Sequence, residues 1–248
     1  MADDLRATLR RGLDPHRNAR RLTSPWPSLN ALIGDGLWPG LYGLTGASGT
    51  GRTQLLLQWL LHAASSDIPA VGYLAFADAM EITARLVGLL EAQWWSTWSP
   101  EDLRARAPAL LNPPQANAPL DVIGLVVPTE DELRARLQKA RSAATQGPVL
   151  VGIDAEDTAK IDWSSVARIA LSAEATVIAV GLSSPPAHVR SIWSGHFDLA
   201  PAAGPRGPSM LRFLKNRHGD RGEVELIYEQ GRFEAPPAEL ELELKDIE

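Results

Sequence analysis

The feature that most restricts the fold of this chain is a glycine-rich segment. It matches the phosphate-binding pattern G-x-x-x-x-G-K-[ST] at every position except the lysine, and its residues are Gly46, Ala47, Ser48, Gly49, Thr50, Gly51, Arg52 and Thr53. Glycines let consecutive backbone N–H groups curve around phosphates, and the helix that follows adds the positive end of its dipole. The pattern therefore predicts a strand, a phosphate loop and a helix in this order.

The residues on both sides of the loop agree with that order. An apolar run predicts a buried strand over 41–45, and a leucine-rich run predicts a helix over 53–65. Thr53 supplies the hydroxyl that such loops place on Mg²⁺. Arg52 keeps the positive charge of the missing lysine but carries it on a wide planar guanidinium. We predict a nucleotide phosphate and Mg²⁺ as ligands, and a glycine-rich turn without a ligand is the alternative.

The composition limits the class of protein. The chain has 248 residues, of which 45% are hydrophobic and 22% charged, which suits one α/β domain with a large core. It has no cysteine, which excludes disulfides and thiolate metal sites and agrees with a cytoplasmic location. No apolar run approaches the length of a membrane span. The formal net charge of −6 disfavours a generally basic nucleic-acid binder but does not exclude a local basic surface.

Charge and composition divide the chain into three parts. We predict a basic arm over 1–24, a nucleotide-binding domain over 25–234 and an acidic tail over 235–248. A short amphipathic helix in the arm would suit docking on a neighbouring subunit or on a DNA backbone, and a solvated arm is the alternative. The tail alternates leucine with glutamate, so it fits either an edge strand or a disordered segment.

Apolar runs alternate with helical segments between these ends, which is typical of a mostly parallel sheet covered by helices. The predicted strands are 41–45, 71–76, 121–127, 148–153, 176–182, 210–215 and 223–229, and the predicted helices are 53–65, 80–92, 101–111, 129–144 and 163–173. Asp154 directly follows the fourth strand, and an aspartate at this place in phosphate-loop proteins lies in the Mg²⁺ shell. An aspartate that only caps the next turn is the alternative.

Several separate stretches resemble the RecA-type ATPase core of recombinases, RadA-type branch-migration proteins and DnaB-type replicative helicases. They are the phosphate loop, its lead-in over 28–40, the run Phe76-Ala77-Asp78-Ala79-Met80, and Lys215-Asn216-Arg217-His218-Gly219 with the residues up to Phe233. The resemblance covers about 25–234. It implies an α/β RecA-like P-loop fold, with a mostly parallel sheet flanked by helices and a C-terminal antiparallel hairpin. It also implies ATP and Mg²⁺ as cofactors, with Thr53 and Asp154 on the metal.

The same resemblance gives Lys215 and Arg217 a trans-acting role, since the family's basic residues in this segment reach the γ-phosphate bound by a neighbouring subunit. A spacing of two residues on a strand places both side chains on one face, where they would meet one phosphate cluster. The implied assembly is a ring or filament with nucleotide at the subunit interfaces. A solvated basic edge is the alternative.

Three positions depart from the family's pattern. Arg52 replaces the lysine. The glutamate that activates the attacking water falls at Met80, or at Ala79 in an alignment shifted by one residue, and neither side chain accepts a proton. Ser184 stands where many relatives carry a glutamine that senses the γ-phosphate. Losing these groups together predicts slow or absent ATP hydrolysis.

Two acidic residues beside the altered position, Asp78 and Glu81, are the candidates for a substitute base. DNA contact in proteins that resemble this fold comes from loops near the sheet centre, and the matching loop here is 183–205. In that loop Arg190 would contact a phosphate of single-stranded DNA and Trp193 would stack on a base. A plain connector is the alternative.

Three functions from different classes stay open. The first is a RecA-like nucleotide-binding protein of DNA repair, recombination or replication that hydrolyses ATP weakly or not at all and recruits other repair or replication proteins. The second is an active single-stranded-DNA-dependent ATPase or helicase motor. The third is a KaiC-like regulatory P-loop protein that does not bind DNA. The altered positions favour the first function over the second, and the segment 215–219 favours the DNA-acting branch over the third.

Overall fold

A computed structural model describes residues 21–93, 96, 98–106, 118–143, 148–155, 161–181, 187–201, 208–218 and 220–236. The strands are β1 (Gly40–Gly46), β2 (Ala70–Leu74), β3 (Leu120–Gly124), β4 (Val149–Asp154), β5 (Ala175–Val180), β6 (Gly195–Ala200), β7 (Ser209–Asn216), β8 (Gly222–Glu229) and β9 (Arg232–Glu234). The helices are α2 (Pro27–Leu32), α3 (Arg52–Ser65), α4 (Ala79–Glu91), α5 (Pro100–Arg106), α7 (Glu130–Ala143), α8 (Trp163–Ser172) and α9 (Ala187–Ile192).

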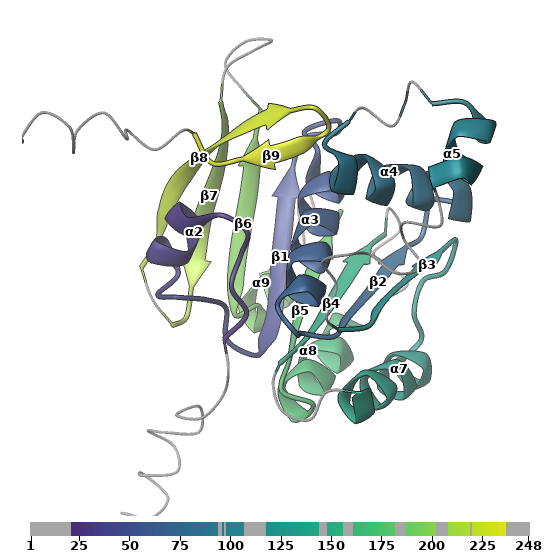
Figure 1. The fold of residues 1–248 in the computed structure, drawn as a ribbon. Coiled ribbons are helices and arrows are strands. Elements are labelled where there is room, and N and C mark those ends of the chain that lie inside the picture. Colours follow the sequence, from purple (N-terminus) through teal and green to yellow (C-terminus); the bar gives the residue numbers. More distant parts are fainter. Residues whose placement is uncertain are drawn as a thin grey trace, which may run out of the picture.

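The described strands form a nine-stranded sheet in the order β3-β2-β4-β5-β1-β6-β7-β8-β9 (Figure 1). The strands from β3 to β6 in this order run parallel, and β6 to β9 pair antiparallel. Every residue of β4 and β5 is buried, as expected for parallel strands covered on both faces. The predicted fold class, a mostly parallel sheet with helices and a C-terminal antiparallel part, is therefore confirmed.

Two hydrophobic cores lie on opposite faces of the sheet. The first includes Trp26 and Trp59, and the second includes Trp163 and Trp193. Figure 1 shows α3 lying across one face of the sheet and α7 and α8 against the other. Within the described part of the chain, no helix has both the length and the apolar character needed to cross a membrane. The end of β1 and the start of α3 lie together at the top of the sheet in Figure 1.

The structure corrects the prediction for segment 183–205, for which the sequence predicts a DNA-contacting loop. Residues Ala187–Ile192 form α9, and Gly195–Ala200 form β6, which pairs with β1. Trp193 lies between them with 0% of its surface exposed, and its ring packs edge-on against His196 at a centroid distance of 4.9 Å. Its predicted stacking on a DNA base is wrong, because the indole has no exposed face.

Other predicted elements lie close to the observed ones, and the differences are local. Helix α2 was not predicted, and β3 ends at Gly124, three residues before the end of the predicted strand 121–127. Leu22 is fully buried and pairs with Leu37, so the core begins before residue 25, the predicted start of the domain. The predicted arm helix, residues 107–111 of the predicted helix 101–111 and the tail from residue 237 lie outside the described residues.

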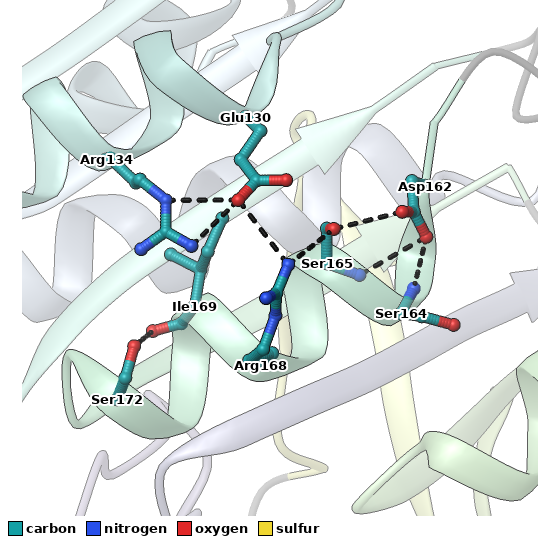
Figure 2. A network of polar contacts seen from close by, with 8 residues as sticks. All are labelled: Glu130, Arg134, Asp162, Ser164, Ser165, Arg168, Ile169 and Ser172. Carbon is teal, nitrogen blue, oxygen red and sulfur yellow. Dashed lines mark hydrogen bonds and ion pairs between the residues drawn. The ribbon is translucent and has the colours of Figure 1, made fainter.

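A polar network fixes α8, the first helix after the strand that ends in Asp154 (Figure 2). The Asp162 carboxylate caps this helix by accepting hydrogen bonds from the backbone N–H groups of Ser164 and Ser165, at 3.0 and 3.2 Å. Arg168 donates to the Ser165 hydroxyl at 3.0 Å and pairs with Glu130 at the start of α7. The network therefore joins the beginnings of α7 and α8.

We predict that Gly43→Ala destabilises the protein by about 1–3 kcal/mol, because an added Cβ would lie 2.2 Å from two atoms of the buried Trp193 ring. The free energy of unfolding, measured by urea denaturation, checks this. The control is the double variant with Trp193→Phe, whose smaller ring leaves room for the methyl group. A cost of Gly43→Ala that is the same in both backgrounds would contradict the contact.

A second prediction concerns pH. Hydrogen bonds from the Ser165 side chain and backbone hold the pKa of the Asp162 carboxyl below its ordinary value of 3.8. A lowered pKa in the folded state gives stability that is present above about pH 4 and is lost as pH falls through the folded pKa. We expect the difference in Tm between the natural chain and Asp162→Asn to shrink between pH 6 and pH 3.

The matched control is Asp67→Asn, an exposed aspartate that makes no hydrogen bond or ion pair with a described residue. It caps no described helix, so it measures how far the Tm changes when an exposed aspartate is replaced without loss of a cap. A difference between the natural chain and Asp162→Asn that stays constant down to pH 3 would argue against the cap.

Candidate functional site

The phosphate loop leaves β1 at Gly46 and enters α3 at Arg52. Gly49 and Gly51 have φ values of 78° and 91°, in the left-handed region that favours glycine. The loop is closed by Thr50, whose hydroxyl donates to the Ala47 carbonyl at 2.9 Å. The N-cap residue of α3 is Gly51, which has no side chain to cap the helix, and no described side chain accepts from its first N–H groups, so these groups are open to an anion.

The structure brings the two predicted metal ligands together. The Thr53 hydroxyl donates to Oδ2 of Asp154 at 2.7 Å, although the two residues are 101 positions apart. Asp154 is 5% exposed at the end of β4. A hydroxyl and a carboxylate at this separation are oxygen donors of the kind that Mg²⁺ takes, usually with waters and substrate phosphates completing its shell. Among the described residues, no group of three or more His, Asp or Glu side chains could hold a metal ion by itself.

A pocket of about 520 Å³ surrounds the loop. One part of its wall is the loop itself with the metal-ligand pair: Ser48, Gly49, Gly51, Arg52, Thr53 and Asp154. The rest includes Gln54, Phe76, Arg85, Ser96 and Tyr228. Arg52 makes no hydrogen bond or ion pair with a described residue, so its guanidinium is available to a ligand. The volume lies in the range of small-molecule sites.

Arg85, which was not predicted as a site residue, is a second guanidinium in the wall of the pocket. It lies on α4 with its side chain 19% exposed, and its Nε and Nη2 both donate to Oε1 of Glu81, at 2.9 and 2.7 Å. The pair has the i,i+4 spacing of a helical ion pair, which was the available sequence signal. Only the fold shows that Arg85 faces the phosphate loop.

The two candidate bases do not line the phosphate pocket. The Asp78 carboxylate caps α4 by accepting from the backbone N–H of Glu81 at 2.8 Å. Asp78 and Glu81 instead border a neighbouring pocket of about 460 Å³, with the exposed Met80 between them in sequence. In this conformation the only carboxylate in the wall of the phosphate pocket, among described residues, is that of Asp154. The sensor position, Ser184, lies outside the described residues.

The structure places Lys215 and Arg217 far from the phosphate loop of their own chain. Lys215 Nζ donates to the Arg190 carbonyl at 2.7 Å, and Arg217 donates to the Ser191 carbonyl, so both cations lie at the C-terminal end of α9. Burial, and then the charge of Arg217, lower the pKa of Lys215. In the sheet register, Asn216 pairs with Gly195, which pairs with Tyr42 near the start of β1.

The loop is at the other end of β1, so these cations lie away from the phosphate loop of the same chain. Their predicted trans-acting role stays a prediction, as does the predicted DNA contact of the exposed Arg190.

A hairpin of β8 and β9 covers the start of α3. This hairpin was not predicted to be part of the nucleotide site. The ring of Phe233 lies against Gly51, and the Tyr228 ring packs on Phe233 at 4.7 Å between centroids. The Gln58 amide fixes the hairpin, since it accepts from the Phe233 N–H at 2.7 Å and donates to its carbonyl at 2.9 Å. Figure 1 shows this hairpin in yellow above the start of α3.

Comparison with known proteins supports the fold. No family model matches the chain, and no curated protein matches its sequence. Among solved structures, the ATPase domain of G40P matches with a TM-score of 0.71 and 13% identity, over 95% of this chain and 99% of that one. The structure of a DnaB-like replicative helicase and its interactions with primase matches with a TM-score of 0.70 and 13% identity, over 93% and 67%. At this identity the likeness concerns the fold, and it confirms the predicted RecA-like fold of DnaB-type ATPase domains.

We predict that Gly51→Ala destabilises the protein by about 2–4 kcal/mol, since φ is 91° and the new Cβ would lie 2.8 Å from the Phe233 ring. Gly49→Ala is the matched control. Its φ is 78°, but a Cβ there meets no atom within 4 Å, so only backbone strain of about 1 kcal/mol is expected. Urea denaturation measures both costs, and equal costs would contradict the role of the hairpin.

Proposed function

We propose that the chain is a RecA-like protein of DNA replication, repair or recombination that binds ATP with Mg²⁺ and hydrolyses it weakly or not at all. The observation that carries the proposal is the 2.7 Å contact between Thr53 and Asp154 beside an uncapped helix start. The fold shared with ATPase domains of DnaB-like helicases supports it.

The residues present fit a nucleotide with its metal ion. The open N–H groups of the loop and of the first turn of α3 would hold phosphate oxygens, and the Arg52 guanidinium would bind one or two of them. The Thr53 hydroxyl and the Asp154 carboxylate would hold Mg²⁺ directly or through water. When bound, Mg²⁺ neutralises charge on the phosphates.

The proposal of weak hydrolysis is supported by the placement of the side chains that could move a proton. A general base must lie within hydrogen-bond reach of the attacking water, or one water away. Asp154 is the only carboxylate in the described wall of the pocket, and it is committed to Thr53 and the metal. Glu81 is bonded to Arg85, and Asp78 caps a helix. None of these groups is placed as a base.

The proposed partners follow from the same resemblance. We propose self-association into a ring or filament, in which Lys215 and Arg217 of one subunit approach the nucleotide of the next. Single-stranded DNA and other replication or repair proteins are further proposed partners. The printed description of one similar structure concerns interactions of a DnaB-like helicase with primase, which supports a replication setting without assigning primase to this chain. An active DNA-dependent motor is the second candidate, and a KaiC-like regulator without DNA binding is the third.

The test measures Mg²⁺-dependent ATP binding by calorimetry and ATP turnover with and without single-stranded DNA. We expect binding without measurable turnover in either condition, and a loss of affinity of about 10- to 100-fold in Arg52→Ala, because a charge-assisted contact is removed. Arg52→Lys is the control that keeps the charge, and it should retain binding.

Other outcomes select other functions. DNA-stimulated turnover that Arg52→Ala abolishes would replace the proposal with an active motor. If the chain binds or hydrolyses ATP, does not bind DNA and shows no effect of DNA on either measurement, the KaiC-like regulator would be favoured. No binding of ATP by the natural chain would reduce the loop to a glycine-rich turn.

A further inference from the structure

The pocket contains a buried amide that nothing in the described protein satisfies. Gln54 follows Thr53 in the first turn of α3, is 1% exposed and lines the phosphate pocket. Neither its Nε2 nor its Oε1 has a hydrogen-bond partner among the described residues. Two other described residues have a buried polar atom without a partner, Tyr73 and Trp193, but both belong to the core on the opposite face of the sheet.

The direction of the Gln54 side chain follows from its helix. Residues four apart lie on the same face of a helix, so Gln54 is one turn nearer to the phosphate loop than Gln58. The Gln58 amide is used on Phe233 of the hairpin, and Tyr228, the strand partner of Phe233, lines the pocket. Gln54 therefore faces the hairpin side of the pocket, beyond the part made by the loop itself.

An unsatisfied buried amide is costly, and an apolar residue of the same size would avoid that cost. A phosphate group alone would not satisfy both atoms of this amide. Phosphate oxygens accept hydrogen bonds, so they would satisfy Nε2 and leave Oε1 unpaired. Sugars and nucleobases offer a donor beside an acceptor, which an amide can match on both atoms. The Phe76 and Tyr228 rings in the same wall offer aromatic faces of the kind on which bases stack.

We propose that Gln54 binds the nucleoside part of the nucleotide and that its amide is satisfied only when this ligand is bound. The inference rests on the proposed function, because it assigns a residue to the ligand proposed there. In this arrangement the loop with Arg52 binds the phosphates, and the side of the pocket under the hairpin distinguishes a nucleotide from a simple polyphosphate.

The experiment compares two ligands, ATP and inorganic tripolyphosphate, each with Mg²⁺, on Gln54→Leu and on the matched control Gln58→Leu. For Gln54→Leu we expect the Kd for ATP to rise about tenfold and the Kd for tripolyphosphate to stay the same. The Tm without ligand should equal or exceed that of the natural chain, since an unsatisfied amide is removed. For Gln58→Leu we expect a lower Tm and an unchanged ratio of the two Kd values, because its amide bonds the hairpin.

Three outcomes would overturn the inference. An unchanged Kd for ATP in Gln54→Leu would show that the amide does not touch the nucleotide. An equal loss for both ligands would assign it to the phosphates. A lower Tm would mean that the protein itself satisfies the amide. If the natural chain binds neither ligand, the proposed function fails as well. If the natural chain and Gln54→Leu bind both ligands equally tightly, only the inference about Gln54 fails.

Discussion

The hydrogen bond between Thr53 and Asp154 joins the phosphate loop to the centre of the sheet, and it depends on how closely α3 approaches β4. Gly152 on β4 makes this approach possible, because a Cβ there would lie 2.9 Å from Leu56 of the helix. Gly72 on β2 makes room for Leu60 of α3 in the same way, because a Cβ at Gly72 would lie 2.9 Å from the Leu60 side chain. Because Gly152 and Gly72 have no side chains, α3 can pack close to the sheet. This close packing brings the first turn of α3 to the end of β4.

The charges around the loop bear on the proposal of binding with weak hydrolysis. Two guanidiniums and an open helix start favour a polyanion, whereas the acidic side chains near the pocket are already used. Arg85 holds Glu81 in an ion pair that is only partly exposed, and Asp154 contacts Thr53. For one of these groups to accept a proton, one of these contacts would have to break, and under the proposed function that reorganisation would add to the barrier of phosphoryl transfer. The same groups that make the pocket attractive to phosphate therefore keep it poor in bases.

Local patterns were enough to predict the loop, its helix, the buried strands and the aspartate at the end of β4, because each is encoded in a short run of consecutive residues. Contacts between distant segments were not predictable in this way. Arg85 has a plain helical spacing to Glu81, and only the packing of α4 brings it to the pocket. Trp193 was predicted to stack on a base from an exposed loop. Its ring is buried instead, and it packs in the space left by the missing side chain of Gly43. The short strand β6 was missed because its buried and half-buried residues alternate over only six positions.

The antiparallel direction of β7 bears on the proposed self-association. It carries Lys215 and Arg217 back to the starting edge of β1, where they bond to the last carbonyls of α9 instead of approaching their own phosphate loop. The end of the sheet with the phosphate loop and this cationic end thus lie at opposite ends of the central strands. Copies arranged head to tail would bring the cations of one chain toward the loop of the next, and repetition of that contact gives a ring if it closes and a filament if it does not. In such an assembly the cations would have to exchange backbone carbonyls for phosphate oxygens, a stronger charge-assisted contact, so assembly and nucleotide binding would be coupled.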